Sequence, residues 1–180
     1  MSDQTALITA AKAGSADAFA DLVRHYRVRL LRFLVTRCTS HADAEDALQD
    51  TLIAAYRYIN TYDPRWRFST WLYRIAIRNA ARIRTHDVVD IDDLRDEGND
   101  PLEACIRSSD TENLWLTARR ELNTDVFTAT WLRYVEDMSI KDISRALDRS
   151  ESWTKVNLLR ARKSLERALN EGREGNEAYG

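Results

Sequence analysis

Cationic and aromatic side chains gather between residues 65 and 82 in a pattern that suits single-stranded nucleic acid. Arg74, Arg78 and Arg82 recur every four residues, so on a helix they would form one stripe. Trp71 comes one turn before that stripe. The preceding loop adds four residues of the same two kinds, Arg65, Trp66, Arg67 and Phe68. Cations can follow a phosphate backbone while unpaired bases stack on rings, although the rings could instead belong to a core and the arginines be simply solvated.

A second cationic segment covers residues 145–167 and holds seven basic and three acidic residues. Ser139 with Asp142, and later Ser150, predict the start of a short helix and of a longer one, because such residues cap helix N-termini. Residues 148 and 149 predict a tight turn between them. These are the dimensions of a helix–turn–helix. A generic helical hairpin with a solvated charged face is the alternative.

The longer of these two helices has an inward and an outward face. The residues expected to pack inward are Thr154, Leu158, Ala161, Leu165 and Leu169. The candidates for contact with duplex DNA are Arg149, Ser150, Ser152, Lys155, Leu159, Arg160 and Arg162. The first residues of a recognition helix meet base edges and flanking cations meet phosphates. The inward hydroxyl of Thr154 needs a hydrogen-bond partner, for which a carbonyl one turn earlier is expected.

An acidic stripe precedes both cationic segments. Ser40 with Asp43 three residues later predicts an N-cap at the start of the helix that carries this stripe. Asp43, Asp46 and Asp50 follow one another at helical spacing, with Gln49 beside them. This face disfavours DNA, so it meets either water or a basic protein surface.

No cofactor, metal or catalytic site is expected. Cys38 and Cys105 are far apart and lack a CxxC spacing, and with three scattered histidines they form no metal-ligand set. No nucleophile–base set or phosphate-binding glycine loop supports an α-helical enzyme. No secretory signal and no apolar run of membrane length is recognisable, so the expected compartment is a reducing cytoplasm and no membrane insertion is expected.

The elements that must position these residues are predicted to be helices throughout. Only five glycines and two prolines occur in 180 residues, which favours long helices over many short strands. Apolar spacings of three and four predict helical segments over residues 5–37, 40–59 and 69–84. Helices resume near Asn113 and include the pair at 139–147 and 150–169. The fold class is therefore all-α.

Charge divides the chain into blocks. Residues 1–85 hold 13 basic and 8 acidic side chains, residues 86–125 hold 4 and 12, and residues 126–180 hold 10 and 9. We expect two small helical domains, 1–85 and 112–170, joined by an acidic flexible linker over 86–111 and followed by a frayed tail over 171–180. A surface loop within one domain is the alternative for the acidic stretch, although structureless loops of that length are uncommon inside compact domains.

Two long segments resemble a known family. AEDALQDTLIAAYRYI, followed by FSTWLYRIAIRNAARI, resembles region two of the extracytoplasmic-function (ECF) sigma factors of the sigma-70 family. MSIKDISRALDRSESWTKVNLLRARKSLERAL resembles their region four. The resemblance covers residues 15–85 and 112–170. The ordered pair, separated by a linker of suitable length, is more specific than either piece.

The resemblance implies a promoter-specificity subunit that directs RNA polymerase core and opens DNA without catalysing a reaction. The residues it implies for docking on a coiled coil of the largest polymerase subunit are Asp43, Asp46, Gln49 and Asp50. Those implied for melting the minus-ten element and capturing an unpaired base are Asn60, Arg65, Trp66, Arg67, Phe68, Trp71, Arg74, Arg78, Asn79 and Arg82. Residues 139–162 match the helix–turn–helix that reads the minus-thirty-five duplex. Implied partners are the core enzyme with its flap region, promoter DNA and an anti-sigma factor.

The recognition helix departs from the family at three positions. Trp153 and Thr154 stand where a small residue followed by Val is more frequent, and Asn157 stands where a basic residue is frequent. The promoter sequence is therefore not predictable. A stand-alone helix–turn–helix regulator with a helical sensing or dimerisation domain is the alternative function.

Overall fold

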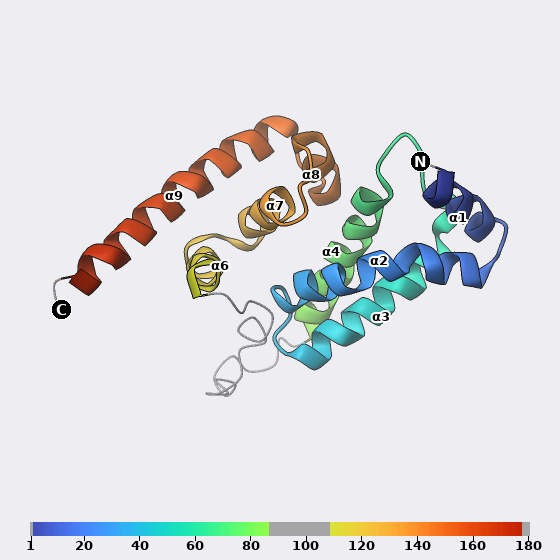
Figure 1. Ribbon diagram of the computed structural model, residues 1–180, viewed down its shortest axis with the longest axis horizontal. Coiled ribbons are helices and arrows are strands. Elements are labelled where there is room, and N and C mark those ends of the chain that lie inside the picture. The colour runs from blue at the N-terminus through green and yellow to red at the C-terminus, as the bar shows by residue number, and fades with distance from the viewer. Residues whose placement is uncertain (1, 87–108, 178–180) are drawn as a thin grey trace. The chain divides into compact units, whose positions relative to one another are not determined.

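The computed structural model describes residues 2–86 and 109–177 of the chain (Figure 1). Every regular element in those two ranges is a helix, which confirms the expected all-α class. Contacts divide the chain into two compact units, residues 1–101 and residues 102–180, called here the N-terminal and C-terminal units. Most of the expected linker, residues 87–108, lies outside the described residues, so its flexibility stays a prediction.

Within residues 2–86, the N-terminal unit is a bundle of four α-helices and one 3₁₀ turn. Its elements are α1 (Ser2–Lys12), α2 (Ala16–Val35), α3 (His41–Arg57), η1 (Ile59–Thr61) and α4 (Phe68–His86). Helices α2, α3 and α4 pack against one another, and α1 packs along α2. Leu30, Phe33 and Tyr73 are fully buried at the centre, where the last two rings meet edge to face with centroids 5.2 Å apart. This core holds the outward faces of α3 and α4 in place.

The first helical segment is in fact two helices, which corrects the single run expected over residues 5–37. Gly14 has a φ of +97°, a backbone conformation that side-chain-bearing residues rarely adopt. Ser15 then caps α2, because its hydroxyl accepts a hydrogen bond from the backbone N–H of Ala18 at 3.2 Å. The apolar spacing continues across this break and so conceals it.

In its described part, residues 109–177, the C-terminal unit contains α6 (Ser109–Glu121), α7 (Thr124–Tyr134), α8 (Ile140–Leu147) and α9 (Glu151–Glu177). Helix α9 packs against the other three, around a cluster of Trp115, Phe127 and Trp131 in which the two tryptophan centroids lie 4.9 Å apart. Helix α9 continues well past its expected end near Leu169 (Figure 1). Residues 171–177 are therefore helical, not a frayed tail.

Three predicted N-caps are confirmed. The hydroxyls of Ser40, Ser139 and Ser150 accept hydrogen bonds from the backbone N–H three residues later, at 3.1, 3.1 and 3.0 Å. Between α8 and α9, Asp148 adopts the left-handed conformation with φ of +57°, which ends α8 and turns the chain into α9. The helix–turn–helix is thus built by local signals that the sequence carries.

Candidate nucleic-acid interface

The inward face of α9 lies as the sequence predicts up to residue 168, while the side chain of Leu169 lies outside the described ones. Leu158, Ala161 and Leu165 are buried, and Thr154 is fully buried. The Thr154 hydroxyl donates to the carbonyl of Ser150 at 3.1 Å, which confirms the expected partner one turn back. These contacts fix the rotation of α9 and hence the residues that it presents to solvent.

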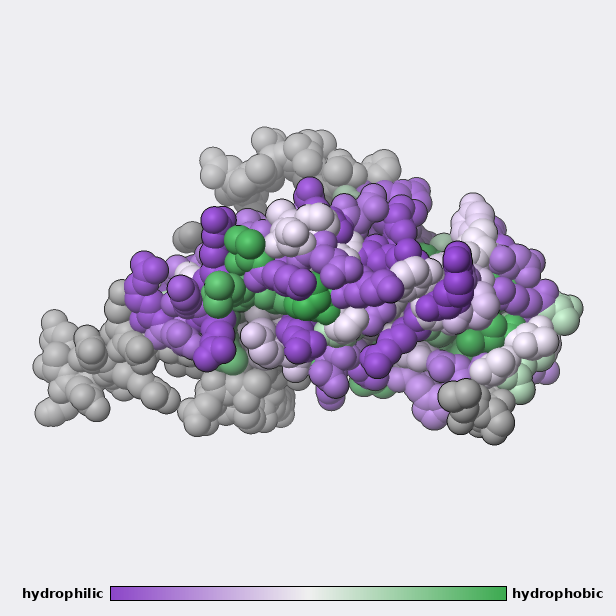
Figure 2. Space-filling view, turned by 90° about the horizontal axis from the view of Figure 1, so that it is seen from above, coloured by the Kyte–Doolittle hydropathy of each residue, from purple (hydrophilic) through white to green (hydrophobic). Residues whose placement is uncertain are grey.

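The outward face of α9 includes two residues that the sequence analysis missed. Ser152, Val156 and Lys163 lie opposite the buried stripe, and all three are exposed. Val156 is 45% exposed and Leu159 57%, and Figure 2 shows hydrophobic surface over the first part of α9 within a mainly hydrophilic face. The inward residues could have indicated these positions, because residues 152, 156 and 163 lie farthest around the helix from the buried stripe.

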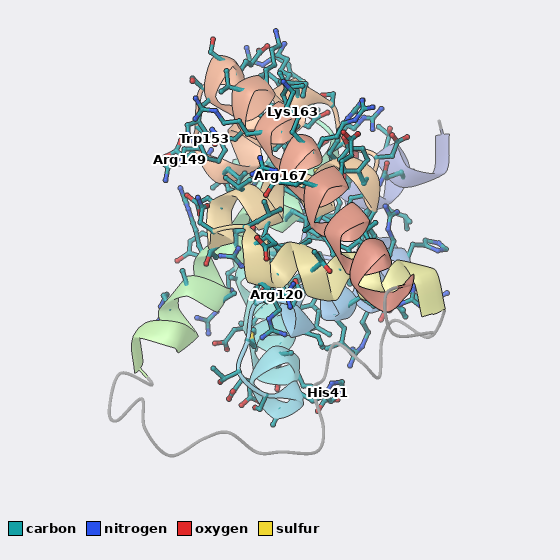
Figure 3. The ribbon with its side chains drawn as sticks, turned by 90° about the vertical axis from the view of Figure 1, so that its left-hand side faces the viewer. His41, Arg120, Arg149, Trp153, Lys163 and Arg167 are labelled. Carbon is teal, nitrogen blue, oxygen red and sulfur yellow. The ribbon has the colours of Figure 1, made fainter. Side chains whose placement is uncertain are left out.

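Arg149 is held at the start of α9 by two contacts. Its guanidinium donates to Asp125 on α7 at 2.6 Å and lies 5.4 Å from the ring centroid of Trp153. Figure 3 shows Arg149 beside Trp153, with Lys163 and Arg167 further along α9. The exposed side chains of Ser152, Lys155 and Arg160 extend the polar surface around this point. The expected residues of the helix–turn–helix between positions 149 and 160 are thus all exposed.

Arg162 lies toward a different side of α9. It lines a cavity of about 280 Å³ together with Leu114, Trp115, Thr130, Tyr134, Leu165 and Glu166. Its Nε donates to Glu166 at 2.8 Å, and this hydrogen bond and charge raise the pKa of Arg162 above its ordinary value. Arg162 therefore shares its charge with a carboxylate and borders α6 and α7 as well as the outward face.

Helix α4 carries the cationic stripe of the N-terminal unit. Arg78 and Arg82 are exposed and Arg74 is half-buried, as expected for three residues on one side of a helix. Trp71 is half-buried and rests on the rings of Tyr62 and Phe68, with centroids 5.7 and 5.4 Å away. A ring braced in this way keeps a fixed orientation while part of its surface stays accessible.

Two residues expected to contact DNA also make contacts within the N-terminal unit. Phe68 is only 3% exposed and packs on Tyr26 and Tyr62, so the core interpretation applies to this ring and base stacking does not. Asn79 is half-buried, and its amide donates to the Thr51 hydroxyl of α3 at 3.3 Å. Phe68 therefore positions α4, whereas a contact of Asn79 with DNA stays a prediction.

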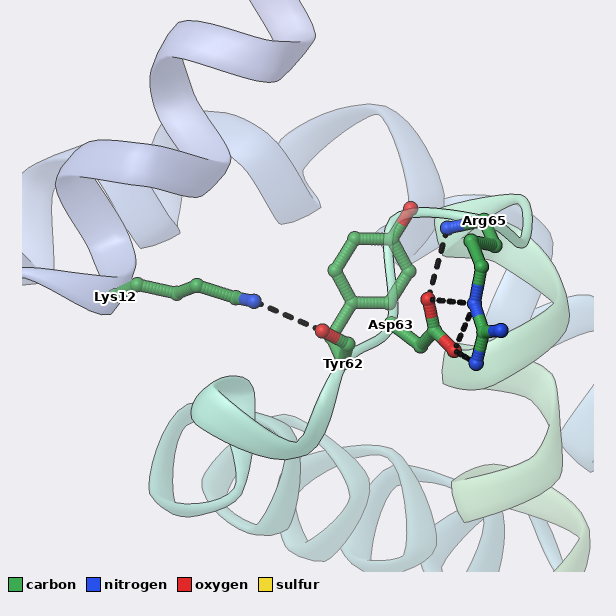
Figure 4. Close-up of polar contacts among 4 residues, drawn as sticks. All are labelled: Lys12, Tyr62, Asp63 and Arg65. Atoms are coloured by element: carbon green, nitrogen blue, oxygen red, sulfur yellow. Dashed lines mark hydrogen bonds and ion pairs between the residues drawn. The ribbon is translucent and has the colours of Figure 1, made fainter.

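The loop between η1 and α4 is ordered by its own side chains. Asp63 accepts hydrogen bonds from the backbone N–H of Arg65 at 3.0 Å and from its guanidinium at 2.6 to 3.0 Å (Figure 4). This pairing raises the pKa of Arg65 above its ordinary value. Asn60 and Arg67 are exposed, whereas Trp66 is half-buried. The loop thus offers two cations and an amide to solvent.

The acidic stripe of α3 is exposed except at its first member. Asp46, Gln49 and Asp50 face solvent, opposite the buried side of the helix. Asp43 is half-buried and accepts a hydrogen bond from the Thr39 hydroxyl at 2.7 Å. Contacts with Ser40, and then with Thr39, hold the pKa of Asp43 below its ordinary value of 3.8. Asp43 is therefore tied to the start of α3, while the other three are available to a partner.

A metal centre and a membrane span are not found in the part of the chain that the structure describes. No three His, Cys, Asp or Glu side chains there come together as a metal site would need. No helix in the same residues is both long and apolar enough to cross a bilayer.

A helix–turn–helix and a separate cationic helical unit define a protein built to bind DNA, and comparisons with known proteins define its family. The model of sigma-70 region 2 matches residues 22–87, and that of sigma-70 region 4 matches residues 114–165. The chain is 31% identical to the ECF RNA polymerase sigma-E factor of Haemophilus influenzae, over 94% of this chain and 96% of that protein. It is 28% identical to the ECF sigma factor SigW of Bacillus subtilis, over 88% and 92%. The chain belongs to the ECF RNA polymerase sigma factors.

Solved structures share the fold. CnrH in complex with the cytosolic domain of CnrY has a TM-score of 0.71 at 21% identity, covering 94% of this chain and 98% of that one. The sigma factor RpoE of Bartonella quintana, in complex with the anti-sigma factor NepR, has a TM-score of 0.61 at 20% identity, covering 84% and 98%. As a sigma factor, the chain directs RNA polymerase core to promoters, and its family is not a class of enzymes.

Proposed function

We propose that three surfaces divide the work of promoter recognition in this chain. The acidic face of α3 docks on core polymerase, the outward face of α9 reads duplex DNA upstream, and α4 with its preceding loop holds the opened strand. The observation that carries the proposal is the charge contrast within the N-terminal unit. Helix α3 exposes Asp46 and Asp50, and the adjacent α4 exposes Arg78 and Arg82. One bundle can therefore meet a basic protein surface and a phosphate backbone.

Strand opening follows from the chemistry of α4. Arg78 and Arg82 would neutralise phosphates of the displaced strand, and the braced ring of Trp71 would stack on a base that has left the duplex. Unstacking a base costs a few kcal/mol, which these contacts would offset. The chain supplies binding energy only and catalyses no reaction of its own.

Duplex reading falls to α9. Ser152, Val156 and Leu159 occupy the outward face of its first turns, where a recognition helix meets base edges. Lys155, Arg160 and Lys163 flank them and would contact phosphates, with Arg149 at the turn. Such phosphate contacts give position on the duplex, while the central side chains supply sequence preference.

Cooperation between the units follows from their size. Each unit alone offers few contacts, so free protein would bind promoter DNA weakly, and core polymerase would raise the effective concentration of one unit once the other has bound. The protein would act in the cytoplasm, with core and chromosome. Since two structural relatives are held in complexes by a cytosolic domain and by an anti-sigma factor, we propose that an inhibitory protein also restrains this chain.

Run-off transcription tests the proposal. Purified core polymerase, with and without this protein, is presented with a genomic promoter library, and new transcripts are sequenced from their starts. The proposal expects a small set of starts that appear only when the protein is present. A library in which the protein changes no start would contradict it.

A further inference from the structure

The end of α1 reaches the loop that precedes α4. Lys12, the last residue of α1, donates a hydrogen bond from Nζ to the backbone carbonyl of Tyr62 at 2.8 Å (Figure 4). The same Nζ lies 5.5 Å from the centroid of the Tyr62 ring. One cation thus holds both the backbone and the ring of Tyr62, across 50 residues of chain, by a charge-assisted hydrogen bond and a cation–π contact.

Tyr62 passes this restraint to the rest of the loop. Tyr62 as a whole residue is 6% exposed, and its ring packs on Phe68 and Trp71 in the first turn of α4. Its hydroxyl donates to the backbone carbonyl of Trp66 at 2.6 Å. Asp63 orders the turn between these two points through Arg65. The loop is therefore fastened at Tyr62, in part by a contact from α1, and at Trp66 by the Tyr62 hydroxyl.

We propose that Lys12 is a positioning residue for the strand-capture loop, defined as residues 60–67. This inference rests on the proposed function of that loop in holding an unpaired base. Lys12 touches no DNA in this account, and it lies before residue 22, where the match to sigma-70 region 2 begins. By fixing Tyr62 it keeps the loop in one conformation, so that capturing a base costs little additional ordering.

The test couples Lys12 to a base that it never contacts. Holoenzyme is bound to pre-opened promoter DNA, taken from the run-off screen, in which each unpaired non-template base is replaced in turn by an abasic site. Wild-type protein should lose about tenfold in affinity at one position, as expected for a lost base stack. Lys12→Met keeps the apolar part of the side chain and removes the hydrogen-bond donor. Holoenzyme with this variant should lose only about threefold in affinity, or less, at the same abasic position. The difference between the two losses is the coupling, as in a double-mutant cycle.

Three controls separate positioning from other effects. Lys12→Arg retains a cationic donor and should restore the abasic sensitivity. Arg27→Met removes an exposed cation from α2 and should leave that sensitivity unchanged. Tyr62→Phe removes the hydroxyl that donates to Trp66, and it should also reduce the abasic sensitivity. This variant tests the loop if Lys12→Met folds poorly. Thermal unfolding of each variant shows whether it folds.

The possible results are distinguishable. The positioning role would be wrong if Lys12→Met kept the full abasic sensitivity of the wild type, or if it lowered affinity equally for every DNA template. Either result would leave base capture intact. Wild-type holoenzyme insensitive to every abasic site would overturn base capture itself, and the role of Lys12 with it.

Discussion

Val156 and Leu159 leave an apolar surface where α9 would meet base edges. The chemical group in the major groove that suits such a surface is the 5-methyl of thymine. We therefore expect replacement of thymine by deoxyuridine in the bound duplex to weaken binding about fourfold at each of one or two positions, from ~0.8 kcal/mol per buried methyl-sized group. Leu159→Ala should abolish much of this discrimination in a competition binding assay with holoenzyme.

Arg160→Ala is the matched control, because it removes a flanking cation from the same helix. It should weaken thymine and deoxyuridine duplexes equally and lower the salt dependence of binding by about one phosphate contact. Equal thymine preference in wild-type protein and Leu159→Ala would show that the apolar surface does not read DNA.

Asp43 should contribute to the loss of stability of the N-terminal unit in acid. Its pKa is lower in the folded protein than its ordinary value, chiefly because of Ser40 and then Thr39. Such a carboxyl stabilises the fold above its unfolded-state pKa, and that contribution is lost as pH falls through the folded-state pKa. The free energy of unfolding, measured in urea by circular dichroism, should fall as pH drops below about 4. Asp43→Asn should show a smaller fall, and an unchanged fall in that variant would contradict this role of Asp43.

Thr154, Phe68 and Val156 show which side-chain positions can be predicted from the sequence and which cannot. The partner of Thr154 could be foreseen because a buried hydroxyl on a helix has a carbonyl one turn back within reach. The place of Phe68 could not, because a ring beside arginines suits a core and a base stack equally well until its neighbours Tyr26 and Tyr62 are known. Val156 was missed because only polar residues and Leu159 were sought on the outward face.

At the scale of elements, Gly14 sets the length of α1 and hence the reach of Lys12. A Cβ at Gly14 would meet nothing within 4 Å, so substitution tests the backbone alone. Gly14→Ala should lower the free energy of unfolding by about 1–2 kcal/mol, because its φ of +97° is costly for alanine. Gly14→Asn should cost less, since asparagine tolerates positive φ better. If Gly14→Ala and the wild type had the same free energy of unfolding in urea, this explanation of the break between α1 and α2 would be wrong.

Local signals explain which elements the sequence predicted. Helices α3, α8 and α9 begin directly after Ser40, Ser139 and Ser150, as the sequence predicts. These starts are predictable because an N-cap residue bonds to backbone within one turn of itself. The break at Gly14 was hidden by apolar spacing that runs across it. The extension of α9 through Gly172 and Gly175 was missed because extending an existing helix needs no new nucleus, so weak helix formers are tolerated.

At the scale of the whole molecule, the acidic face of α3 should decide whether the two units reach DNA together. Asp46→Lys combined with Gln49→Lys should reduce binding to core polymerase at least tenfold, because an exposed acid and an exposed neutral amide would both become positive charges facing a basic surface. Helicity should not change, since both positions are exposed. Glu45→Lys, a charge reversal at an adjacent exposed position, is the control and should bind core more tightly than the double variant in a pull-down titration.

The division into two helical units was foreseen from the charge blocks and from the two resembling segments, because charge and apolar spacing change together near residue 86. The acidic linker itself lies mainly in residues 87–108, outside the described ranges. Its flexible character therefore stays a prediction from the sequence.

Permanganate reactivity of thymines on a linear duplex promoter tests the central claim most directly, since permanganate oxidises unpaired thymines. The account predicts reactive thymines in a short stretch just upstream of the transcript start when core and this protein are both present, and none with either alone. Trp71→Ala, provided it folds, should weaken that signal. A protein that protects duplex DNA without core, and produces no reactive thymines with it, would be a stand-alone regulator and would contradict the account.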